Sequence, residues 1–269
     1  MTTELLRELY RAVRGRAETA SVPTGRLAYL EPGNQWYRPV IAGVSSLAPQ
    51  VTGAAAVRRA RSVLERLDCD EYHRYVMNVY DAGLDTLGEA WAYADLYTTL
   101  SGVTTVLRPE TYLEIGVRRG QSMSMVAAHA PACSIYGFDL WLQGYAGLEN
   151  PGKTFVNQQL GRVGFTGCAQ FTDGDSASTV PTFLAAHPDL YFDLITVDGD
   201  HSARGARLDL QHVLPRLKVG GVLVFDDIAN PSHPELRAVW QDTVASRPDM
   251  SSWTFVEAGF GVAFALRAA

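Results

Sequence analysis

The sequence predicts an α/β protein built on a doubly wound sheet of seven strands, with a mainly helical N-terminal extension before it. From residue 111 onward, short and nearly continuous apolar runs alternate with segments of helical period. That alternation is typical of parallel strands covered by helices on both faces. The last two runs follow each other around a glycine, which predicts an antiparallel hairpin at the C-terminal edge.

The first part of the chain has the apolar spacing of helices rather than of strands. Apolar residues recur at intervals of three and four, while a stretch over 22–40 is dense in Pro, Gly and aromatic residues and predicts irregular chain. We expect helices over 3–13, 52–67 and 87–103. We therefore divide the chain into residues 1–108, a helical lid or oligomerisation region, and residues 109–269, the sheet domain.

The elements of the sheet domain follow one another in a regular order. Helices are expected over 120–130 and 202–217, between apolar runs. The expected strands cover 111–117, 134–140, 169–174, 192–198, 220–227, 253–258 and 261–267.

Composition and charge exclude several classes of partner. The chain has 269 residues and a net charge of −6 without a Lys/Arg block, which argues against nucleic acid and anionic membranes. No apolar run reaches the roughly 18 residues of a membrane span, and the first residues lack the apolar core of a secretion signal. Three widely spaced cysteines fit reduced thiols. We expect a cytoplasmic protein that acts on a small molecule.

Polar clusters follow five of the predicted strands at the point where each strand ends. Because the carboxyl ends of parallel strands meet at one edge of a sheet, ligands bind there. Helix capping accounts for one such cluster, but five at one edge predict a binding site. The clusters are Glu114–Gly120, Asp139, Asp173–Ser176, Asp198–His201 and Asp226–Asp227.

The first cluster, "EIGVRRGQS", leads from a strand through two glycines into a helix. Gly116 allows a tight turn, and Gly120 starts a helix whose N–H groups face a ligand. The spacing is neither GxGxxG nor that of a nucleoside triphosphate loop. Asp139, about 20 residues on, is placed to bind a ribose diol, so a cofactor containing a nucleoside is expected.

The segments "YLEIGVRRGQS", "GFDLW", "DGDS" and "FDLITVDGDHSARGARLDLQHVLPRLKVGGVLVFDDI" resemble class I S-adenosylmethionine-dependent methyltransferases, which have a Rossmann-like fold. More narrowly, they resemble the macrocin O-methyltransferase group, metal-dependent enzymes that methylate sugar hydroxyls on natural products such as antibiotics. The resemblance covers about residues 109–228. It implies S-adenosylmethionine as cofactor, S-adenosylhomocysteine as product, a glycosylated small-molecule acceptor and a homo-oligomer.

The resemblance also implies roles for individual residues. It assigns a divalent metal to Asp198, Asp226 and Asp227. The chain departs from the family pattern at Arg118, where relatives have an aromatic residue, and at Gln121, where they have glycine. To the cofactor it assigns Glu114, Gly116, Arg119, Gly120, Ser122, Asp139, Asp175 and Ser176.

The chemistry of methyl transfer to a hydroxyl explains such a set of residues. Three converging carboxylates repel one another unless a cation neutralises them, and an all-oxygen site suits Mg²⁺. The ion would orient vicinal hydroxyls of the acceptor and lower their pKa. His201, whose ordinary pKa is about 6.5, is then the general base, with Asp198 as the alternative. Asp200 and Ser202 are expected to cap a helix, and Asp193 and Asp209 to lie in solvent or turns.

Other functions remain open on the sequence alone. The acceptor could be a catechol or polyketide hydroxyl, since any vicinal diol chelates the metal. The DGDH element also resembles cephalosporin 7α-hydroxylase-type proteins, which act with a partner. In a different class, the chain could be a non-catalytic scaffold that binds the cofactor.

Overall fold

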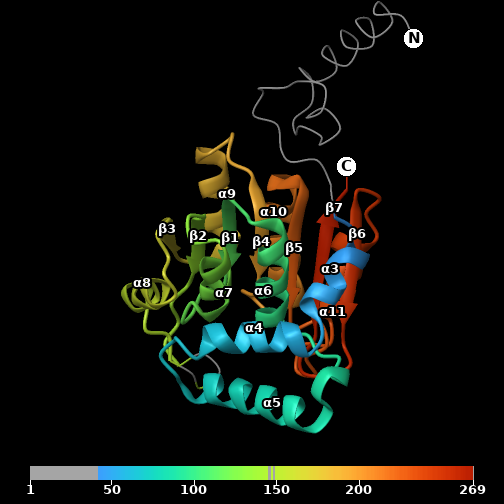
Figure 1. Ribbon diagram of the computed structural model, residues 1–269. Helices are drawn as coiled ribbons and strands as arrows, with labels where there is room; N and C mark the ends of the chain where they lie inside the picture. The colour runs from blue at the N-terminus through green and yellow to red at the C-terminus, as the bar shows by residue number, and fades with distance from the viewer. Residues whose placement is uncertain (1–41, 145–146, 148, 269) are drawn as a thin grey trace, which may run out of the picture.

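The computed structural model of the protein describes residues 42–144, 147 and 149–268. Seven strands form one sheet in the order β3-β2-β1-β4-β5-β7-β6 (Figure 1), and β7 runs antiparallel to both of its neighbours. The Rossmann-like fold class predicted from the sequence is confirmed. The strands are β1 (Thr111–Ile115), β2 (Ser134–Asp139), β3 (Cys168–Asp173), β4 (Phe192–Val197), β5 (Leu217–Asp226), β6 (Met250–Phe255) and β7 (Val262–Arg267).

Alternate residues of the central strands enter two separate cores. Tyr112 packs with the helices of one face and Leu113 with those of the other, as the two-residue period of a strand requires. One face carries α3 (Val44–Val51), α4 (Ala54–Leu64), α6 (Leu96–Leu107) and α7 (Gln121–His129). The opposite face carries α9 (Ser176–Ala186), α10 (Ala203–Val213) and α11 (Leu236–Trp240), while α8 (Lys153–Arg162) packs against α7.

The N-terminal helices differ in part from the sequence prediction. The helix expected over 52–67 is present as α4, but the one expected over 87–103 begins only at Leu96. Asp95 caps it through a reciprocal pair of hydrogen bonds with Thr98, and Trp91 and Tyr93 upstream stack on each other at 4.8 Å. The segments 3–13 and 22–40 lie outside the described residues.

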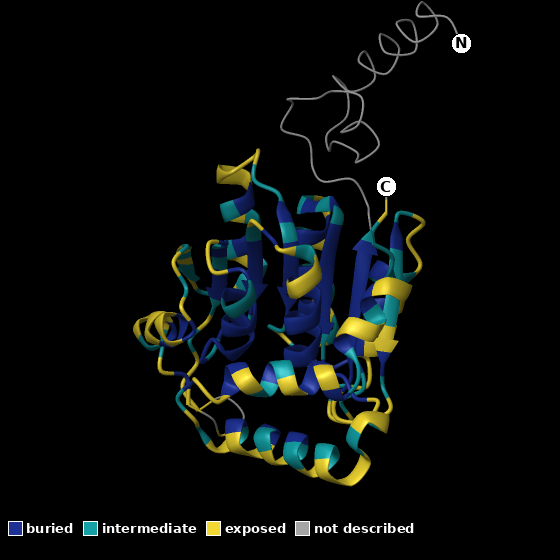
Figure 2. Cartoon of the chain, viewed as in Figure 1, coloured by how far each residue is buried: buried dark blue, intermediate teal, exposed yellow. Residues whose placement is uncertain are grey.

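A helix that the sequence did not predict, α5 (Glu71–Leu87), lies with α4 along the edge of the sheet to which the parallel strands point (Figure 1). Asp70, its N-cap, accepts a hydrogen bond from Arg118 in the loop after β1 at 2.7 Å. The outer side of α5 is largely exposed, whereas the strands are buried (Figure 2). The N-terminal region therefore covers the edge where the predicted site lies.

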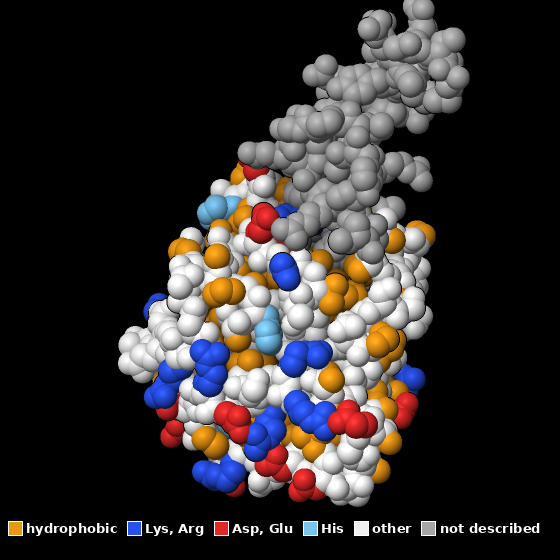
Figure 3. Space-filling model, in the orientation of Figure 1, with side chains coloured by type: hydrophobic (Ala, Val, Ile, Leu, Met, Phe, Trp, Pro, Cys, Tyr) orange, Lys and Arg blue, Asp and Glu red, His pale blue; other side chains and the backbone are white. Residues whose placement is uncertain are grey.

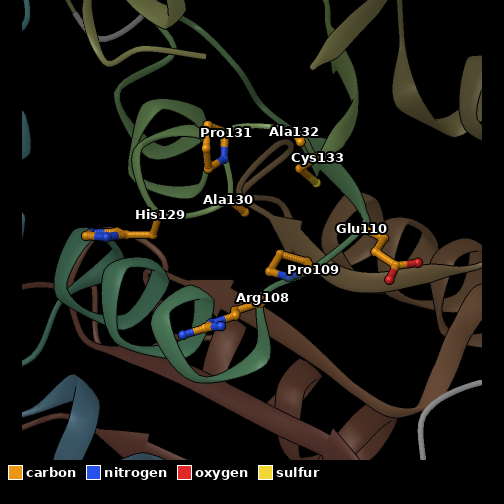
Figure 4. A pocket seen from close by; sticks show the side chains of 8 residues that line it. All are labelled: Arg108, Pro109, Glu110, His129, Ala130, Pro131, Ala132 and Cys133. Carbon is orange, nitrogen blue, oxygen red and sulfur yellow. The ribbon is translucent and has the colours of Figure 1, made fainter. Parts of the chain in front are cut away.

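The opposite edge of the sheet holds a pocket of about 300 Å³. It is lined by Arg108–Glu110 and His129–Cys133, before β1 and β2 (Figure 4), and includes no predicted site residue. On the face in Figure 3, acidic and basic side chains intermingle over the α4–α5 side of the molecule. None of the described helices has the length and apolarity needed to span a bilayer.

The contact between α3 and α6 gives a test of the packing. A Cβ at Gly102 in α6 would overlap the carbonyl oxygen of Gln50 in α3, so Gly102→Ala should lower the free energy of unfolding by about 1–3 kcal/mol. Gly161 in α8 faces open space, and Gly161→Ala should be neutral or stabilising by up to about 1 kcal/mol. Urea unfolding followed by circular dichroism measures both. Equal stability of the two variants would contradict the described helix contact.

Candidate active site

The loops after β1 and β4, at the centre of the sheet, contact each other through backbone atoms. Gly116 follows β1 with φ +89°, and a Cβ there would overlap the carbonyl oxygen of Asp198, which follows β4. The Asp198 N–H donates to the Ile115 carbonyl at 2.9 Å. Only glycine fits at position 116, because the loop that carries Asp198 and His201 lies against it.

Glu114 is fully buried on β1 and bound within the protein. Its carboxylate accepts hydrogen bonds from Ser122 on α7 and from Tyr112 at 2.7 Å, and Tyr112 also donates to Thr196 at 2.9 Å. Burial raises the pKa of Glu114 to about 8, although both hydrogen bonds oppose the rise. Glu114 and Ser122, both predicted to bind the cofactor, therefore brace β1 against α7 beneath the glycine loop.

Asp139 binds the same loop from the end of β2. One oxygen accepts the N–H groups of Val117 at 2.8 Å and Arg118 at 2.7 Å, and the other accepts from the Trp141 N–H and from Asn150 at 3.1 Å. A carboxylate accepts about four hydrogen bonds, so these four fill it. A ribose diol would have to replace one of these donors.

The other residues that were predicted to bind the cofactor lie at three places along the same edge of the sheet. Gly120 is the N-cap of α7 with φ +71°, as expected for a helix start. Arg119 is 6% exposed; its guanidinium meets Asp70 at 3.3 Å and covers the Phe155 ring at 4.5 Å. It therefore ties α5 and α8 to the loop. Asp175 and Ser176 start α9, where the Asp175 carboxylate accepts the Ala177 N–H at 2.9 Å.

The acids after β4 and β5 meet around His201. Its Nε2 lies 3.2 Å from the Asp198 carboxylate and its Nδ1 3.3 Å from that of Asp227. Asp227 has φ +62°, a left-handed conformation that costs free energy in a non-glycine residue and is typical of functional sites. His233 packs edge-on to His201 at 5.2 Å, and Asn230 donates to Asp227 at 3.0 Å.

The negative charge of this acid cluster (Asp198, Asp226 and Asp227) is not fully balanced by positive charge around it. Burial and the charge of Asp198 raise the pKa of both Asp226 and Asp227. Burial alone would lower the pKa of His201, but the hydrogen bond to Asp198 and the nearby carboxylates prevail and raise it to about 9. The cluster as it stands therefore favours binding a proton or a cation.

The donor set fits Mg²⁺ in its chemistry. Carboxylate oxygens are the ligands that hard divalent cations prefer, and the raised pKa values mark charge that such an ion would neutralise. In the described part of the chain, no three His, Cys, Asp or Glu side chains already stand as a ligand set. His201 lies between Asp198 and Asp227 instead, so it would have to turn away from one of them to admit an ion.

Two acids lie in places that the sequence did not predict. Asp209 on α10, expected in solvent, is 1% exposed beside Gly199, and burial raises its pKa to about 6. Asp193, also expected in solvent or a turn, accepts from Thr111 and Lys218 at 3.0 Å at the opposite edge. The capping predicted for Ser202 is confirmed: it caps α10 and accepts the Gly205 N–H at 3.0 Å.

The pKa of Glu114 gives a pH test. Its value is raised in the folded protein, so its contribution to stability is complete at low pH and is lost as pH rises from about 4.5 to about 8. Glu114→Gln should remove this loss and flatten the stability profile across that range, by an amount on the order of a few kcal/mol. Urea unfolding at pH 5, 6.5 and 8 checks this. Parallel profiles for wild type and variant would contradict the buried, proton-binding carboxylate.

Comparisons with known proteins identify the domain. Residues 113–228, from β1 to the end of the acid cluster, match a family described as a methyltransferase domain. No curated protein matches the sequence significantly. Among solved structures, the O-methyltransferase TomG from Streptomyces achromogenes, involved in tomaymycin synthesis, is 19% identical with a TM-score of 0.53, over 76% of this chain and 92% of that chain.

A second similar structure is an O-methyltransferase from Bacillus cereus in complex with S-adenosylhomocysteine. It is 15% identical with a TM-score of 0.50, over 62% of this chain and 78% of that chain. At these identities both structures show the shared fold, and the family match supplies the activity class. Residues 113–228 therefore form a methyltransferase domain of the class I S-adenosylmethionine-dependent type.

Proposed function

We propose that the protein transfers the methyl group of S-adenosylmethionine to a hydroxyl oxygen of a sugar carried by a secondary metabolite. The main support for this proposal is the acid cluster with His201, which lies next to the glycine loop through the contact between Gly116 and the Asp198 backbone. A hydroxyl is a poor nucleophile at neutral pH; a base can remove its proton, and a cation beside it lowers the pKa of the hydroxyl. TomG and the Bacillus cereus protein, both described as O-methyltransferases, support oxygen as the receiving atom.

The residues of the cluster have separable roles in this proposal. Asp198, Asp226 and Asp227 would hold Mg²⁺, which would supply Lewis-acid activation of vicinal acceptor hydroxyls. His201 takes the acceptor proton on a ring nitrogen. It can do so once the charge of the neighbouring carboxylates, which raises its pKa, is neutralised. Asp198 is the alternative base.

The cofactor roles follow the geometry of the glycine loop. Asp139 positions the Val117 and Arg118 N–H groups and contacts the ribose, Gly116 and Gly120 form the turn beside the methionine end, and Asp175–Ser176 lie beside the adenine. Glu114, Ser122 and Arg119 hold the loop in place. The described part of the N-terminal region covers the acceptor side.

Asp139 gives a test of the cofactor assignment. Asp139→Asn weakens charge-assisted hydrogen bonds to the loop, so S-adenosylhomocysteine should bind about 10- to 100-fold more weakly in isothermal titration calorimetry. Asp242→Asn is the matched control. Asp242 is an exposed carboxylate in an ion pair with Arg207 at 3.3 Å, and its substitution should leave affinity within about twofold. Equal affinities of the two variants would remove Asp139 from the cofactor site.

The reaction is tested by methyl transfer from radiolabelled S-adenosylmethionine to a panel of methyl glycosides with free vicinal hydroxyls, with catechol in parallel. We expect turnover with Mg²⁺ that a chelator abolishes, and a kcat about 10²- to 10⁴-fold lower for His201→Ala with unchanged S-adenosylhomocysteine affinity. His187→Ala, an exposed histidine at the far end of α9, is the control. Preference for catechol would favour the aromatic acceptor class, and full activity of His201→Ala would exclude His201 as the base.

A further inference from the structure

One side chain of helix α5 lies against the glycine loop. Tyr72 is the second residue of α5, and the Arg118 guanidinium lies 5.5 Å from its ring centroid. Arg118 belongs to the loop whose Gly116 touches Asp198. An ion pair of 2.7 Å between Arg118 and Asp70 fixes the start of α5 on this loop. Tyr72 therefore contacts Arg118 of the glycine loop, and Gly116 of the same loop contacts Asp198.

The hydroxyl of Tyr72 is the part of the side chain left for a ligand. Its ring packs against the core of the α4–α7 face and neighbours Tyr75 at 6.4 Å. Among the described residues, its hydroxyl has no hydrogen-bond partner, in contrast to Tyr80 and Tyr97 nearby, which donate to Asp95 and Gln121. Tyr72 is half-buried and its hydroxyl is not enclosed by the protein, so the hydroxyl is open to a ligand.

The electrostatic surroundings agree with this position. Burial raises the pKa of Tyr72 far above its ordinary value, and the charges of Asp226, Asp95, Asp198 and Asp227 raise it further. The phenol therefore stays neutral, and its hydroxyl is a hydrogen-bond donor rather than a base.

We propose that Tyr72 binds the acceptor, with its hydroxyl donating to an oxygen of the acceptor next to the methylated position, and that it selects oxygen-rich acceptors. The inference rests on the proposed function, because it assigns an acceptor contact to the same site. A site built to bond a substrate oxygen rejects an analogue that lacks it. The N-terminal region thereby supplies a specificity-determining residue that the methyltransferase domain itself does not contain.

Tyr75, one turn further along α5 and 62% exposed, offers a matched control. Tyr72→Phe removes only the hydroxyl and should raise the acceptor KM about 3- to 10-fold, with little change in kcat or in S-adenosylhomocysteine affinity. Tyr75→Phe should change none of these. A Tyr72→Phe variant with the wild-type KM for a methylated acceptor overturns the proposal.

A second readout does not depend on turnover. With 3-fluorotyrosine at position 72 or 75, the ¹⁹F resonance is followed while methyl α-L-rhamnopyranoside or catechol is added to protein holding Mg²⁺ and S-adenosylhomocysteine. We expect a shift at position 72 and none at 75. A shift without methylation of any probe retains Tyr72 as a binding residue and rejects the proposed reaction. Methylation without a shift retains the reaction and overturns the role of Tyr72, and the absence of both overturns both.

Discussion

The contact between Gly116 and the carbonyl of Asp198 is the constraint on which the site depends. The loops after β1 and β4 lie so close that no side chain fits between them. One of these loops carries the helix start and the N–H groups held by Asp139, and the other carries Asp198 and His201. Because adjacent central strands lead into both loops, the glycine loop and the acid cluster come together without a long connection between them.

The negative charge of the acid cluster is the second feature on which the site depends. Three neighbouring, largely buried carboxylates repel one another, and the raised pKa values of Asp226 and Asp227 reflect that cost. Asp227 adds a left-handed backbone conformation. Strain and like charge in one place are typical of sites that a ligand completes. The buried hydrogen bonds of Glu114 beneath the loop supply the rigid support that such a site needs.

The sheet and the position of its acids could be predicted from the sequence because both are local patterns: apolar runs mark the strands, and the acids follow them directly. The predictions that were wrong concern features set by contacts between segments far apart in the sequence. Asp209 has the sequence setting of a solvent-facing acid on an amphipathic helix, and only the fold buries it. The residues before Leu96 suit a helix, but the stacked rings of Trp91 and Tyr93 and the Asp95 cap override that propensity. No local pattern shows that α5 brings Tyr72 to Arg118.

If the acid cluster binds a divalent cation beside the cofactor, a Mn²⁺ titration followed by electron paramagnetic resonance will detect it, with S-adenosylhomocysteine present, on wild type and on the double variant Asp226→Asn/Asp227→Asn. We expect one stoichiometric site in the wild type that is lost in the variant. Absence of a site in the wild type, or a site that survives in the variant, would contradict this expectation.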